Sequence, residues 1–82
     1  MKYMVEFQFP AERREAILHR FEERGPNRNP GVKFRDAWIG ERDHVIFVLV
    51  ESADIAEVQS ACCTWTDIGP ARITPVVAVE QL

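Results

Sequence analysis

The sequence predicts an α+β fold, a four-stranded antiparallel sheet with two helices on one face. Two stretches with apolar residues at helical spacing each end in Gly-Pro, and they separate segments of strand character. The third observation is the unbroken apolar run 45–50, which is apolar on both faces of a strand. We therefore expect this strand at the centre of the sheet, with a second face that needs a partner.

The first half begins with a strand over residues 2–9, because polar and apolar residues alternate there. One face carries Tyr3, Val5, Phe7 and Phe9, and the other carries Lys2, Met4, Glu6 and Gln8. Pro10 ends the strand and suits the first turn of a helix over 11–24. The apolar stripe of that helix consists of Ile17, Leu18 and Phe21, extended by Ala11 and Arg14.

A second strand is expected over 32–39, joined to the central strand over 44–51 by a short polar turn at 40–43. Simple alternation puts Val32, Phe34, Asp36 and Trp38 on one face and Lys33, Arg35, Ala37 and Ile39 on the other. The two strands form a hairpin.

Ser52 is the expected N-cap of the second helix, with Asp54 in its first turn. The buried stripe of this helix consists of Ile55, Val58, Cys62 and Trp65. The last strand is expected over 72–80. It contains Pro75, which cannot donate a ladder hydrogen bond and so indicates a sheet edge or a bulge.

The order of elements is the ferredoxin-like βαββαβ pattern, within one domain that spans residues 1–82. Its usual sheet order, 4-1-3-2, makes the first and third strands central and the last an edge. The doubly apolar strand is third and the proline-bearing strand is fourth, so both observations favour this topology.

Composition argues against several classes of function. The net charge is −3, so nucleic acid is not an expected partner. No run approaches the length of a membrane span, and no signal peptide is recognisable. Two adjacent cysteines suit a reducing compartment, and we expect a cytoplasmic protein. Two histidines and two neighbouring cysteines lack metal-ligand spacing, and no phosphate-binding loop occurs, so we expect neither a metal nor a cofactor.

With both helices on one side, the other sheet face carries Met4, Glu6, Gln8 and half of the third strand. An apolar patch of this kind usually marks an interaction surface. We therefore expect a homodimer in which two sheets pack face to face, as in a dimeric α+β barrel.

Four polar or aromatic residues are candidates for a site. Glu6 on a central strand can act as a general acid or base, or can pair across the dimer with an Arg or Lys such as Arg35 or Arg72. Asp36 and Trp38 can line a ligand pocket, although Trp38 equally suits a core or dimer contact. His44 is either a base at the mouth of a cavity or an exposed residue at the end of the hairpin.

Several short motifs resemble those of an uncharacterised family of small bacterial domains. They are Met1-Lys2-Tyr3-Met4-Val5, Phe9-Pro10, Trp65-Thr66-Asp67-Ile68 and Ile73-Thr74-Pro75-Val76. The family is similar in fold to the dimeric α+β barrels, which include cofactor-free monooxygenases, muconolactone isomerases, haem-degrading enzymes and non-catalytic domains. Members often have a His after the second-strand Trp, whereas Ile39 follows Trp38 here. Fold resemblance does not choose among these activities.

Three functions remain open from the sequence. The first is a protein of unknown function whose dimer binds a small apolar or aromatic molecule between its sheets, contacted by Glu6, Asp36 and Trp38. The second is a cofactor-independent monooxygenase or isomerase, with Glu6 or His44 as base and Trp38 as a platform. The third is a non-catalytic structural or regulatory domain whose interior is filled by side chains. A hollow interior would favour the first two, and a packed one the third.

Overall fold

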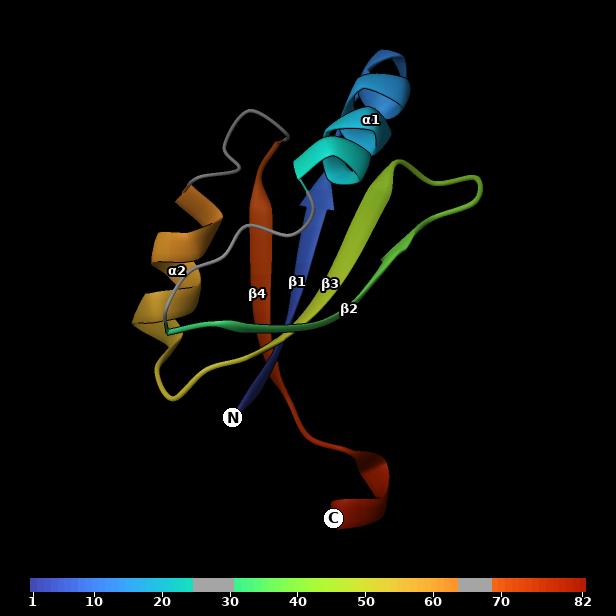
Figure 1. The fold of residues 1–82 in the computed structure, drawn as a ribbon. Helices are drawn as coiled ribbons and strands as arrows, with labels where there is room; N and C mark the ends of the chain where they lie inside the picture. The colour runs from blue at the N-terminus through green and yellow to red at the C-terminus, as the bar shows by residue number, and fades with distance from the viewer. Residues whose placement is uncertain (25–30, 64–68) are drawn as a thin grey trace.

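The computed structural model describes residues 1–24, 31–63 and 69–82. Its elements are β1 (Lys2–Gln8), α1 (Arg14–Arg24), β2 (Lys33–Ile39), β3 (Val45–Glu51), α2 (Ile55–Cys63) and β4 (Ala71–Val76), with short 3-10 helices η1 (Ala11–Arg13) and η2 (Val79–Gln81) (Figure 1). The predicted order of strands and helices is confirmed.

The four strands form one antiparallel sheet in the order β2-β3-β1-β4. This is the expected ferredoxin-like order. The doubly apolar β3 is central, as predicted, because both of its faces need cover. The strand that contains Pro75 is at an edge, as predicted, since a proline there leaves no ladder bond unmade.

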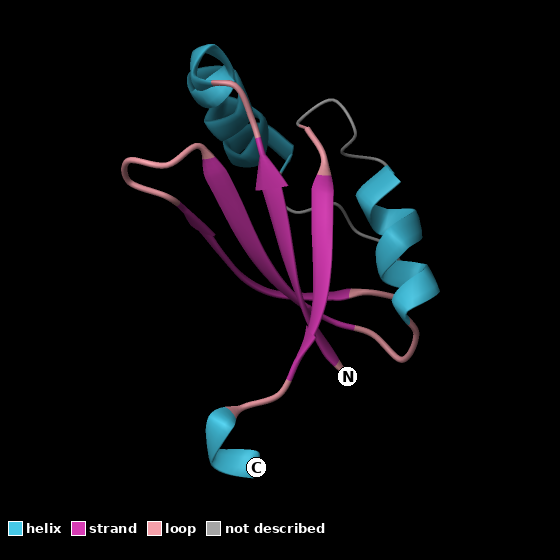
Figure 2. Cartoon of the chain, turned by 180° about the vertical axis from the view of Figure 1, so that it is seen from behind, coloured by secondary structure: helices cyan, strands magenta, loops and turns pink. Residues whose placement is uncertain are grey.

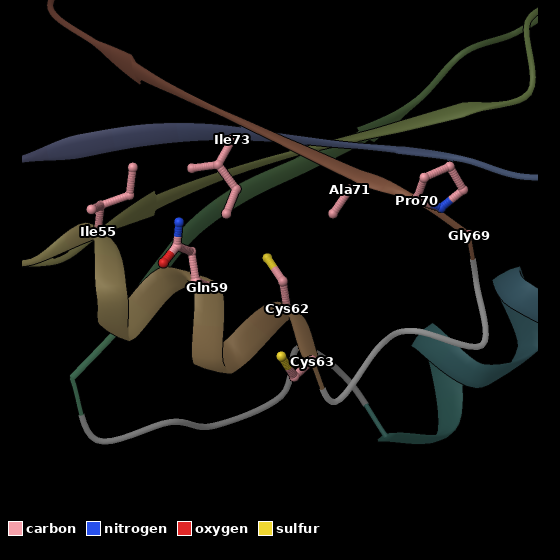
Figure 3. Close-up of a pocket in the computed structure, with 8 residues that line it drawn as sticks. All are labelled: Ile55, Gln59, Cys62, Cys63, Gly69, Pro70, Ala71 and Ile73. Atoms are coloured by element: carbon pink, nitrogen blue, oxygen red, sulfur yellow. The ribbon is translucent and has the colours of Figure 1, made fainter.

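The hydrophobic core lies on one face of this sheet, under both helices. Tyr3, Val5 and Phe7 of β1 are buried there with Ile17 of α1 and Val58 of α2. Figure 3 shows both helices on the same side of the sheet. The helices therefore cover one sheet face, and every core residue on the described strands lies on that face.

Several helix details differ from the sequence prediction. The first α-helix begins at Arg14 and not at residue 11, and Ile55, which was assigned to the buried stripe of the second helix, is 37% exposed. Leu18 is 39% exposed whereas Ile17 is only 2% exposed, so Leu18 was wrongly assigned to the core stripe. In α2 the N-cap is Asp54 and not Ser52, because Asp54 Oδ1 accepts the N–H of Ala56 at 2.9 Å. Ser52 lies two residues earlier, where it is buried and its hydroxyl oxygen accepts the N–H of Asp54 at 3.3 Å.

The last strand is shorter than predicted. Its final residue, Val76, pairs with Lys2, which is the first residue of β1. Beyond this point β1 offers no partner, so the chain leaves the sheet and forms η2 in place of a strand reaching residue 80 (Figures 1 and 2). The predicted strand boundary at residue 80 is therefore wrong.

The second strand is interrupted by a bulge. Phe34 lies opposite Val50, but Asp36 lies opposite Leu49, so the register shifts by one residue at Arg35. The extra residue puts Phe34 on the helix-covered face, and the prediction that it shares a face with Asp36 is wrong. The positions after the bulge keep the predicted relation between Asp36 and Trp38.

Trp65, which the sequence places in the stripe of the second helix, lies outside the described residues, as does Gly25-Pro26. Gly69 lies within the described residues, has a φ of +156° and lies where the chain passes the end of β1. A Cβ at this position would collide with the carbonyl oxygen of Gln8, so the close approach of β4 to β1 requires glycine.

None of the described helices is long and apolar enough to span a bilayer.

Candidate functional site

The pairing register fixes which side chains lie on the sheet face opposite the helices, which we call the open face. Directly paired residues share a face, so the open face consists of successive rows that cross the strands from β2 to β4. The first row is Lys33, Glu51, Lys2 and Val76; the second is Asp36, Leu49, Met4 and Thr74; the third is Trp38, Phe47, Glu6 and Arg72; Val45 and Gln8 follow.

The centre of the open face is apolar. Met4, Phe47 and Leu49 are only half-buried, although they lie on the two central strands. Trp38 on the neighbouring edge strand is 49% exposed. The apolar side chains of both central strands therefore form a partly exposed patch at the centre of the open face.

Glu6 lies in the middle of the third row, between Phe47 on β3 and Arg72 on β4. Its side chain is half-buried, and Arg72 is exposed. In the described part of the chain, neither side chain has a hydrogen bond or an ion pair. The structure thus places a carboxylate and a guanidinium on adjacent strands, both free to meet an outside group.

Asp36 and Trp38 lie on the same face as Glu6, because the bulge precedes them. Asp36 pairs with Leu49 and Trp38 pairs with Phe47. Asp36 Oδ1 accepts the N–H of Ala37 at 2.9 Å, which fixes the carboxylate next to the bulge. The structure therefore brings three of the four candidate residues together on the open face.

His44 is not brought to them. It precedes Val45, an open-face residue, and so belongs to the other side of the strand. Its carbonyl accepts the N–H of Phe9 at 3.1 Å, and its ring contacts the Phe9 ring edge-on at a centroid distance of 5.7 Å. His44 is an exposed residue at the end of the hairpin, away from the open face.

A charged cluster at one end of the open face was not identified from the sequence. Arg35, the bulge residue, donates from Nε to Glu51 Oε2 at 2.8 Å and also from Nη2. These hydrogen bonds hold the pKa of Glu51 below its ordinary value of 4.5, and the nearby charges of Lys2 and Lys33 act in the same direction. The bulge makes this contact, and it could not be inferred from simple alternation.

A second concavity lies between α2 and β4, on the helix side of the sheet (Figure 3). Its volume is about 670 Å³, and it is lined by Ile55, Gln59, Cys62, Cys63, Gly69, Pro70, Ala71 and Ile73. The Cys62 side chain points towards β4, and burial, followed by the neighbouring Cys63, raises the pKa of its thiol. Residues 64–68, which connect its two walls along the chain, lie outside the described residues.

Within residues 1–24, 31–63 and 69–82, no three His, Cys, Asp or Glu side chains lie close enough to hold a metal ion. Cys62 and Cys63 are free thiols, the first half-buried and the second exposed. The chemistry that the open face offers is therefore stacking on Trp38 and Phe47, and hydrogen bonding or charge pairing at Glu6, Asp36 and Arg72.

Comparison with protein-family models supports the resemblance to an uncharacterised family of small domains. Comparisons with curated proteins and with solved structures gave no significant match. Residues 1–82 match the family described as Domain of unknown function (DUF3303). The match covers the whole chain, and the protein therefore belongs to the DUF3303 family.

Proposed function

We propose that this domain forms a homodimer through the open face and holds a small, flat apolar or aromatic molecule between the two sheets. The observation that carries this proposal is the register, which puts Glu6, Asp36 and Trp38 on the uncovered face together with Met4, Phe47 and Leu49. In this arrangement Trp38 contacts the ligand, and Glu6 and Asp36 fix its orientation.

The sheet edges support association through the face and not through the edges. The β4 edge contains Pro75, which lacks a backbone donor. The β2 edge is bulged at Arg35 and carries charged side chains. Bulges, charges and prolines are the usual means of preventing strand addition at an edge. A second copy therefore gains more by covering the apolar face.

The ligand class follows from the third row of the open face. Trp38 and Phe47 are directly paired on adjacent strands, so their side chains project from neighbouring positions of the open face, which we call the Trp38–Phe47 shelf. A flat ring can stack on this shelf, while the half-buried Glu6 accepts a hydrogen bond from a hydroxyl or amine of the ligand.

Because two free thiols suit a reducing environment, we place the dimer in the cytoplasm.

Titration with anilinonaphthalene sulfonate tests the ligand part of this proposal, because the probe combines a flat aromatic system with an anionic group. We expect saturable fluorescence with the wild-type protein, an affinity at least about tenfold weaker for Trp38→Ala, and no change for Leu18→Ala. Leu18 is a matched control, since it is an exposed apolar residue on α1.

A third variant separates the open face from the concavity between α2 and β4. Ala71→Trp would fill that concavity from the β4 side. Probe binding that is lost in Ala71→Trp and retained in Trp38→Ala would place the ligand between α2 and β4, and the proposed site would be wrong. Binding lost only in Trp38→Ala would support it.

A further inference from the structure

We infer that the two copies meet about a two-fold axis that runs parallel to the strands, between β1 and β3, and that each ligand site is shared between the copies. This inference rests on the proposed dimer. The axis follows from the distribution of charged and apolar side chains over the open face.

Symmetry determines which residues face each other. Rotation about an axis parallel to the strands shifts no residue along the strand direction, so each row faces the same row of the second copy with the strand order reversed. β2 then faces β4 of the second copy, and β3 faces β1. The register within one chain therefore specifies the contacts between two chains.

The first row of the open face gains pairs of opposite charge in this arrangement, although its Lys33 faces Val76. Lys2 on β1 faces Glu51 on β3 of the second copy, and the same pair forms again across the axis. In the second row, Leu49 faces Met4, so apolar side chains meet at the centre. Opposite charges at the end and apolar contact in the middle are the features that a stable isologous interface needs.

An axis perpendicular to the strands gives poorer contacts. Each strand then faces the same strand of the second copy with its row order reversed. Glu51 would face Val45 and Lys2 would face Gln8, whereas Glu6 faces an apolar side chain about either axis. This arrangement desolvates charged groups without giving them partners, which is costly. Charge complementarity therefore selects the axis parallel to the strands.

The selected axis makes the ligand site composite. In the third row, Trp38 faces Arg72 of the second copy, and Phe47 faces Glu6. Packed sheets are about 10 Å apart, so a flat ring on the Trp38–Phe47 shelf reaches the carboxylate and the guanidinium opposite. Each dimer has two such sites. They suit an aromatic molecule with a hydrogen-bond donor for Glu6 and an anionic group for Arg72.

Charge exchange tests the arrangement without any ligand. Lys2→Glu alone and Glu51→Lys alone each put like charges opposite one another in a homodimer. An equimolar mixture of the two variants forms a heterodimer in which both facing pairs are again of opposite charge. We expect each single variant to raise the dimer Kd about tenfold or more, and the mixture to recover a Kd close to that of the wild type, measured by sedimentation velocity.

The intrachain neighbours of Lys2 and Glu51 do not confuse this result. Lys2 and Glu51 are also paired within one sheet, and Glu51 also accepts hydrogen bonds from Arg35, but each of these contacts lies within one chain and is the same in the monomer, the homodimer and the heterodimer of a given variant. Matched controls are Glu12→Lys and Arg13→Glu on η1, which are exposed on the helix side. We expect no change of Kd for these controls, either alone or mixed. If Glu51→Lys does not fold, the cycle Lys2→Gln and Glu51→Gln must show non-additive changes in Kd.

The outcomes distinguish this inference from the proposed function. A wild-type dimer whose charge variants are not rescued by mixing, or a cycle that is additive, would overturn the axis and leave the open-face dimer intact. A wild-type protein that stays monomeric would overturn both. For the shared site, an equimolar mixture of Trp38→Ala and Arg72→Ala should recover about a quarter of the wild-type capacity for anilinonaphthalene sulfonate, because about half of the dimers are heterodimers and each heterodimer has one intact site of two. No recovery in a mixture that does form heterodimers would show that the site is not shared.

Discussion

Replacement of Trp38 by Ala is expected to weaken self-association strongly. Trp38 is 49% exposed in the single chain, and a Trp buries up to roughly 250 Å² when it is fully covered. About 120 Å² thus remains available to a partner, which at about 25 cal/mol per Å² corresponds to about 3 kcal/mol for each copy. Even a third of the two-copy total, about 2 kcal/mol, would raise the dimer Kd about 30-fold.

Sedimentation velocity over a range of concentrations measures this Kd directly. Circular dichroism of each variant checks that the fold is retained, because the other half of Trp38 packs within its own sheet. Leu18→Ala is the matched control: Leu18 is 39% exposed on α1, away from the open face, and its loss should leave Kd unchanged. A folded Trp38→Ala protein with a Kd within about threefold of the wild type would refute the reasoning, since it would mean that the open face is not the contact.

Three further predictions concern the fold and its titrating groups. Ile17→Ala should lower the free energy of unfolding by about 2–5 kcal/mol in urea, whereas Leu18→Ala should cost less than about 1 kcal/mol; similar losses would contradict the assignment of the core. The Arg35 hydrogen bond lowers the pKa of Glu51, so its stabilisation is present above the ordinary value of 4.5 and is lost as the pH falls through the lowered pKa. The difference in urea midpoint between wild type and Glu51→Gln should therefore shrink below that pH, and a constant difference would argue against the ion pair. Burial raises the pKa of the Cys62 thiol, so the Cys63→Ser variant should react with a disulfide reagent more slowly than the Cys62→Ser variant; equal rates would show that burial does not protect Cys62.

The sequence was sufficient for the topology because its strongest signals are local. The run 45–50 is apolar on both faces wherever it is placed, and Pro75 cannot donate in a central strand. The ends of the strands were harder to predict from the sequence. The end of β4 at Val76 depends on where β1 begins, which is a pairing between distant residues and not a property of residues 77–80 themselves.

In the candidate site, too, relations within one strand could be predicted from the sequence, whereas pairings between strands could not. Alternation correctly relates Asp36 to Trp38, and Glu6 to Met4, because each pair is two residues apart in one strand. It does not reveal the bulge at Arg35, which moves Phe34 to the helix side and brings Arg35 to Glu51. The position of Arg72 beside Glu6 likewise follows from the register between β1 and β4, which a single sequence does not specify.

The mass of the wild-type protein in solution tests the central claim most directly. A chain of 9.4 kDa that covers its open face with a second copy should sediment at twice that mass at concentrations of tens of micromolar. A species of 9.4 kDa at those concentrations would contradict the claim, because the apolar centre around Leu49 would then be stable in water without a partner.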